Sequence, residues 1–165
     1  MEPQTLLQKY ARGERHFAKS NLARVDLSLV DLSHINLSHA NLSQAILHGT
    51  TLIRANLSHT NLAQAKLIAA DFSGADLSNS NLRDALLSSA ELAGTSLQGA
   101  NLENATLSHS NLRGANLKNA NLRNANLRGA DLRGADLLGA NLQQADLSDV
   151  IVEDPAAPSP QVPQL

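Results

Sequence analysis

The chain has 165 residues, a net charge of −2 and no cysteine, and only 2% of its residues are aromatic although 42% are hydrophobic. The lack of cysteine excludes disulfides and thiolate metal sites, and the scarcity of aromatic side chains argues against an ordinary globular core, in which they fill large volumes. No apolar run approaches the ~20 residues that a membrane span needs.

The first sixteen residues are predicted to form a cap and a lead-in. Leu6 and Tyr10 lie at helical spacing, Pro3 suits a first helical turn, and Gly13 suits a C-terminal stop. These signals predict a short helix over residues 4–12, which would cover the first structural unit of the segment that follows.

That segment repeats every five residues. From Phe17 to Val152, each fifth residue is Leu, Phe or Val without a change of register. A five-residue step rotates ~140° around an α-helix and alternates faces in a flat strand, so neither element buries this pattern. A chain that bends after each unit does bury it, because each unit then forms one side of a closed coil. We therefore predict an all-β solenoid over residues 17–152, with stacked coils paired as parallel strands.

The residue before each central position indicates how many units make one turn. Every twentieth residue from Asn21 to Asn141 is asparagine, whereas the column that begins at Asp26 is mixed. Residues twenty apart are therefore expected to lie above one another, which gives four units per turn and about seven coils. Stacked asparagines are expected to form a hydrogen-bonded ladder.

Most units place a small residue two positions before the central one, where a larger side chain would overpack the interior. Val25, Val30 and Ile35 break this rule, so the first coil is expected to be wider or differently packed. Phe72 occupies a central position and is expected to need space from its column neighbours.

The unit of a small residue, Asn or Asp, Leu and two variable residues is clearest over residues 115–132. It resembles the pentapeptide repeat family. The resemblance implies a right-handed quadrilateral parallel β-helix, with the central Leu and the preceding small residue inside, and a bacterial source. Some family members are DNA mimics that bind type II topoisomerases through a long acidic surface and a dimer. Because this chain is nearly neutral, such a regulator is kept as the alternative function.

Branched aliphatic residues stand out at outward positions on the third side of the coil. They are Leu29, Ile46, Ile68 and Leu86. Clustered apolar surface on a soluble protein often marks an interaction site, although single apolar side chains on a surface are ordinary. These four residues are the candidate site for a protein partner, which is either an unidentified protein or another copy of the chain.

The polar residues do not form a reactive constellation. His39 and His59 are twenty apart and are expected to stack, but two histidines without a third ligand make a poor zinc site. Serine–histidine pairs such as Ser38 and His39 lack an orienting acid. We predict no catalytic residue, no metal and no cofactor, and the chain is not expected to be an enzyme.

Basic residues follow one another without an acid between Glu103 and Asp131. They are spread over the four sides of the predicted rod as a belt, whereas nucleic-acid sites usually need one basic face. This distribution favours a solvated surface over nucleic-acid binding. The members of the belt are Arg113, Lys118, Arg123, Arg128 and, just beyond, Arg133.

The last segment, residues 153–165, contains four prolines and is predicted to be a disordered tail. At the other end of the chain, residues 1–5 lack a basic start followed by an apolar run, so no signal peptide is expected. Together these features predict a cytoplasmic, non-enzymatic interaction scaffold with a protein partner and no nucleic-acid partner.

Overall fold

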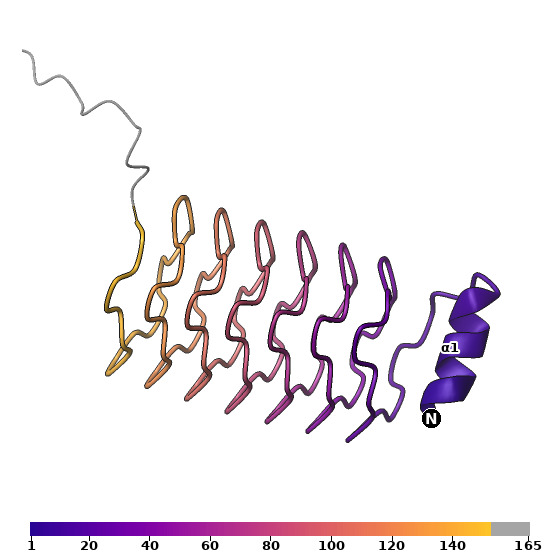
Figure 1. Ribbon diagram of the computed structural model, residues 1–165. Helices are drawn as coiled ribbons and strands as arrows, with labels where there is room; N and C mark the ends of the chain where they lie inside the picture. Colours follow the sequence, from indigo (N-terminus) through magenta and orange to yellow (C-terminus); the bar gives the residue numbers. More distant parts are fainter. Residues whose placement is uncertain (153–165) are drawn as a thin grey trace, which may run out of the picture.

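One short helix, α1 (Pro3–Ala11), precedes a continuous stack of coils (Figure 1). The computed structural model describes residues 1–152, so the predicted tail at 153–165 lies outside the described residues. Parallel bridges join residues twenty apart along the whole stack, from His16 with Asn36 to Asp131 with Ile151. The prediction of four units per turn is therefore confirmed, and each side of a coil contributes one bridging residue rather than a long strand.

The coil bends at the two variable residues of every unit. In one example, the amide of Val25 donates to the carbonyl of Leu22 at 3.2 Å, which closes a four-residue turn. The third residue of this turn, Arg24, has φ +60°. A positive φ at this position alone is the mark of a type II turn, so a repeated type II turn is what makes the chain four-sided.

Neighbouring coils are joined by three backbone hydrogen bonds on each side. The amides of Leu22 and Arg24 donate to the carbonyls of Asn41 and Ser43 in the next coil, at 2.7 and 2.9 Å. In return, the amide of Asn41 donates to the carbonyl of Ser20 at 2.9 Å. Each side of a coil therefore offers two N–H groups and one C=O group to the coil that follows it.

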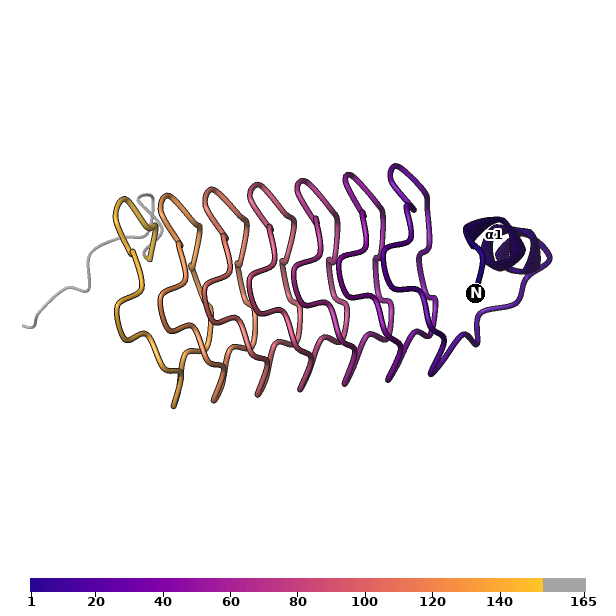
Figure 2. The same ribbon diagram turned by 90° about the horizontal axis from the view of Figure 1, so that it is seen from below.

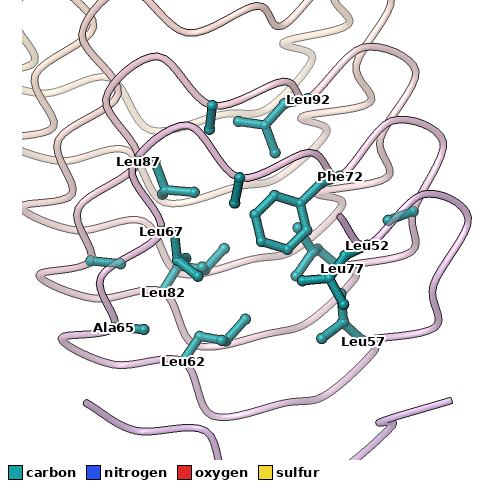
Figure 3. Packing of buried hydrophobic residues seen from close by; sticks show 14 of the residues in the cluster. Leu52, Leu57, Leu62, Ala65, Leu67, Phe72, Leu77, Leu82, Leu87 and Leu92 are labelled. Atoms are coloured by element: carbon teal, nitrogen blue, oxygen red, sulfur yellow. The ribbon is translucent and has the colours of Figure 1, made fainter. Parts of the chain in front are cut away.

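The interior is filled by columns of leucine, with Phe72 fully buried among them. Figure 3 shows its ring pointing into the interior, with Leu52 and Leu92 of the adjacent coils in the same column. Burying a leucine contributes ~1.5–3 kcal/mol, and the repeat makes this contribution at almost every unit. Near the start, Ile35 is fully buried and Val30 is partly exposed. The bridges of the first coil keep the twenty-residue step, so these branched residues fit without a change of register.

Helix α1 lies across the N-terminal end of the stack (Figure 2). It begins and ends one residue earlier than predicted, with Pro3 at its first turn. Leu6 is fully buried, and the hydroxyl of Tyr10 donates to the carbonyl of Ser33 at 2.9 Å. The guanidinium of Arg15 stacks 3.8 Å from the centre of the Tyr10 ring. These contacts make α1 a cap that covers the first coil. No helix within residues 1–152 is long and apolar enough to cross a bilayer.

Candidate functional site

The third side of the rod carries the aliphatic residues that the sequence singles out. Its bridging column runs through Ile46, Lys66 and Leu86 in consecutive coils. Ile46 and Leu86 are thus two coils apart, or ~9.6 Å at ~4.8 Å per coil, with the exposed Lys66 between them. Lys66 belongs to the same twenty-residue column of the sequence, although the aliphatic pattern does not include it.

Ile68 lies in the same coil as Lys66, two residues further along the third side. Its side chain is 37% exposed and that of Leu86 is 39% exposed, while Ile46 is half-buried. The structure therefore places three predicted site residues in three consecutive coils of one side. We call Ile46, Ile68 and Leu86, with Lys66, the aliphatic patch.

Leu29, the fourth predicted site residue, lies at a corner of the first coil. It is 83% exposed and has φ +60°, a conformation that costs an ordinary residue ~1–2 kcal/mol. Its side chain leans over Gly49 in the next coil, where a Cβ atom would lie only 2.8 Å from Leu29 Cδ2. Leu29 is therefore an exposed corner residue of the third side, one coil before Ile46.

Three of the five cations in the basic belt are paired with acids in neighbouring coils. Lys118 Nζ lies 3.0 Å from an Asp136 oxygen, and Arg128 Nε lies 3.3 Å from an Asp149 oxygen. Arg123 faces Glu103 at 4.0 Å, and Arg133 chelates Asp131, two residues before it. The first three pairs join neighbouring coils and are largely exposed, whereas the pair of Arg133 with Asp131 lies within one coil and is partly buried. It does not form a continuous cationic face.

These ion pairs and the hydrogen bonds of the corner turns lower the pKa values of two carboxyl groups, those of Asp131 and Asp136. The hydrogen bond from the Arg133 side chain lowers the pKa of Asp131. The backbone amide of Leu138, and then Lys118, lower the pKa of Asp136. Both carboxylates are therefore stabilised in their charged form.

His39 and His59 stack as predicted, with ring centres 4.7 Å apart and an interplanar angle of 0°. Parallel rings direct their in-plane nitrogen lone pairs along separate planes, so the pair does not converge on one ion. Within residues 1–152, no three His, Cys, Asp or Glu side chains gather at a position suited to a metal, and no pocket is found.

The asparagine column of the second side forms the predicted ladder. Asn41 donates through its side-chain amide to the Asn21 side chain at 3.3 Å, and Asn81 donates to Asn61 at 3.2 Å. Each acceptor oxygen also holds a turn, as where Asn21 accepts from the amide of Ala23 at 3.3 Å. Each of these asparagine side chains therefore links two coils and also stabilises the turn of its own unit. This double role accounts for the column that contains only asparagine.

A family model for pentapeptide repeats matches residues 16–44, 45–84, 85–124 and 110–149. The chain belongs to the pentapeptide repeat family. It adopts the right-handed β-helix of this family. No curated protein sequence matches the chain.

Solved pentapeptide repeat proteins are similar over most of the chain. One from the Arabidopsis thaliana thylakoid lumen is 32% identical over 65% of this chain and 71% of its own, with a TM-score of 0.54. HetL, involved in heterocyst differentiation regulation in the cyanobacterium Nostoc sp. strain PCC 7120, is 28% identical over 92% and 97%, with a TM-score of 0.30. QnrB1, a plasmid-mediated fluoroquinolone resistance protein, is 18% identical over 84% and 80% in a trypsin-treated form, with a TM-score of 0.56. The likeness to QnrB1 concerns the fold alone.

Proposed function

We propose that this protein is a rigid, non-enzymatic interaction scaffold that binds a protein partner through the aliphatic patch on its third side. One observation carries the proposal: Ile46, Ile68 and Leu86 lie in consecutive coils of one side, at positions that the repeat elsewhere gives mainly to polar residues. The regular backbone that carries these side chains needs no ordering on binding, so association costs less conformational entropy than it would on a flexible loop.

Besides an apolar surface, the partner needs a negative charge that can pair with the exposed Lys66 within the patch. An ammonium group between two aliphatic side chains favours a partner that brings an apolar ridge with a carboxylate at its middle. Another copy of the chain supplies this combination less readily, since Lys66 would face its own equivalent in a symmetric contact. The partner we favour is therefore a different protein.

A regulator of a type II topoisomerase is the alternative, and the described surface favours it less. A DNA mimic needs a long acidic face, whereas four acids around the basic belt are paired with a cation, as Asp136 is with Lys118. A supercoiling assay with purified topoisomerase separates the two: the scaffold leaves supercoiling unchanged, and a DNA mimic inhibits it.

The test of the scaffold compares three forms of the chain as bait in a native lysate. The Ile46→Lys/Leu86→Lys variant places charges at both ends of the patch and is expected to lose the protein that the wild type retains. The Thr51→Lys/Ser96→Lys variant adds the same two charges at bridging positions of the fourth and first sides and is expected to retain it. Circular dichroism and a thermal melt establish that all three are folded.

Two results would contradict the proposal. One is retention of the same proteins by all three forms, which makes the patch incidental. The other is loss of binding by both double variants, which ties binding to net charge rather than to the third side. A retained protein is then titrated in purified form to measure its Kd for each bait.

A further inference from the structure

The turns beside the aliphatic patch lack a hydrogen-bond acceptor that most other turns have. In most units, an Asn or Asp at the bridging position accepts from the amide two residues later, as Asp26 does from Ser28 at 3.0 Å. Three consecutive bridging residues of the third side carry no such oxygen, so the amides two residues after them have no acceptor among the described residues. These amides belong to His48, Ile68 and Ser88.

Lys66 adds a charged donor to these free amides. Its ammonium group forms no ion pair within residues 1–152, and its two neighbours in the column are Ile46 and Leu86. A carboxylate accepts hydrogen bonds from an ammonium group and from a backbone amide, and such charge-assisted bonds are stronger than neutral ones. The unit that holds Lys66 and Ile68 is therefore the position in the patch that suits a partner's carboxylate.

The bridging backbone of the patch leaves no open edge for a partner strand. The amide of Lys66 donates to the carbonyl of Ala45 at 2.9 Å, and its carbonyl accepts from the amide of Leu47 at 2.8 Å. Leu86 makes the same two bonds one coil further on. Strand addition needs a row of open donors and acceptors, so the patch favours a partner segment whose backbone hydrogen bonds are internal, as they are in an α-helix.

The spacing of the coils also separates a helix from an extended segment. Lys66 and Leu86 lie ~4.8 and ~9.6 Å beyond Ile46 along the rod. A helix parallel to the rod places residues three or four positions on at ~4.5–6.0 Å and the residue seven positions on at ~10.5 Å. A strand places its same-face residues at ~6.7 and ~13.4 Å. The helix therefore matches the patch to about 1 Å, whereas the strand is out of step by about 4 Å.

We infer that the partner presents an amphipathic α-helix, which lies along the third side parallel to the rod axis. This inference rests on the proposed function and specifies the partner. Two apolar helix residues seven positions apart contact Ile46 and Leu86. The positions three and four residues after the first bring an acid and a further apolar residue. The acid accepts from Lys66 and from the amide of Ile68, and the apolar residue packs on the Ile68 side chain.

The corner beside the patch leaves room for such a helix. The three corner residues in the coils of the patch are small, and they are Gly49, Ala69 and Ser89. Leu29 leans over Gly49 from the preceding coil and extends the apolar surface by one coil. From Leu29 to Leu86 the surface spans three steps between coils, or ~14 Å, which corresponds to about ten residues of helix.

Designed peptides, titrated into the full-length protein and followed by fluorescence anisotropy, test the inference. The probe is a labelled amphipathic peptide of about 18 residues, since shorter helices are marginal in water. It carries leucine at the first, fifth and eighth positions of one face and glutamate at the fourth, and a second probe exchanges the two middle residues. One control peptide has the same composition in strict apolar and polar alternation. The other control peptide has lysine in place of the glutamate.

At least one helical probe is expected to bind the wild type more tightly than the alternating peptide does. Ile46→Lys/Leu86→Lys is expected to abolish this binding. Lys66→Glu is expected to weaken it about tenfold, as loss of a charge-assisted hydrogen bond predicts, and the lysine peptide is expected to restore the affinity. Lys19→Glu makes the same change of charge at an exposed residue of the first side and is expected to leave binding unchanged.

Three results would overturn the inference. Equal or tighter binding of the alternating peptide would exclude the helix and leave the patch as a binding surface, so the proposed function would stand. Unchanged affinity in Lys66→Glu would remove the carboxylate from the interface. Failure of both helical probes to bind would also reject the helix, while the lysate comparison with Ile46→Lys/Leu86→Lys decides the proposed function separately.

Discussion

At the scale of single residues, the corners of the coil are where carboxylates contribute most directly to folding. Asp26, Asp31 and Asp146 each accept hydrogen bonds from the hydroxyl and the backbone amide of the serine two residues later. The serine hydroxyl first, and then its amide, lower the pKa of each of these three carboxyl groups. Because the folded state favours the charged form, this contribution is fully present above the unfolded value and is lost as pH falls through the lowered one.

We therefore expect acid to destabilise the protein through these corners. The pKa values of all three carboxyl groups are lowered from the ordinary value of an aspartate, which is about 3.9, so the loss should occur below about pH 4. An asparagine at these positions can accept the same hydrogen bond from the backbone amide and does not titrate, as Asn41 shows by accepting from the amide of Ser43. The triple variant Asp26→Asn/Asp31→Asn/Asp146→Asn should lose less stability than the wild type between pH 7 and pH 3, measured as the shift of the urea midpoint. An equal shift in both proteins would contradict this account.

At the scale of elements, α1 covers the N-terminal end of the stack, where backbone acceptors outnumber donors. At the C-terminal end, donors outnumber acceptors. The first coil turns mainly C=O groups toward α1, since the N–H groups point forward. Acceptor-rich and donor-rich ends are complementary, so exposing the first coil would allow copies to stack head to tail in open fibres. The buried Leu6 is the main apolar contact of α1 with that coil.

Leu6→Glu is expected to release α1 and to produce concentration-dependent assembly of the rod. Burying an unpaired carboxylate at a fully buried position costs several kcal/mol, which exceeds what one short helix contributes. The neighbouring Thr5 is exposed, so Thr5→Glu adds the same charge without this cost and serves as the control. Light scattering after size-exclusion chromatography gives the mass of each variant, and a Leu6→Glu protein that has the mass of the wild type at all concentrations would refute the prediction.

Much of the coil could be predicted from the sequence because every fifth residue fills the same interior position. The step of twenty and the ladder followed from the asparagine column between Asn21 and Asn141, and the buried Phe72 followed from the five-residue period. The directions of the long surface side chains could not be predicted from the repeat. Lys118 reaches Asp136, which is eighteen residues on, and Arg128 reaches Asp149, which is twenty-one residues on. Long side chains lean along the surface rather than along the column, so ion pairs across coils depend on geometry that the repeat alone does not fix.

At the scale of the whole molecule, these ion pairs decide what the rod offers to a polyanion. A charged ligand such as duplex DNA binds by displacing counterions from several phosphates at once, and its affinity then falls steeply with salt. Lys118, Arg123 and Arg128 each face an acid of a neighbouring coil. A phosphate would have to separate these pairs and would meet the freed carboxylate beside the cation.

We therefore expect the wild-type protein not to bind a fluorescent duplex in an anisotropy titration, even at about 50 mM salt, where phosphate contacts are strong. The Asp136→Asn/Asp149→Asn variant uncovers Lys118 and Arg128 without adding a cation, and it should bind weakly, with an affinity that decreases as salt is raised. Asp26→Asn/Asp31→Asn changes the net charge equally but lies at the opposite end of the rod, away from the belt, and should behave as the wild type does. Binding by the wild type with a steep salt dependence would mean that the pairs open readily, and the belt would then be a surface for polyanions after all.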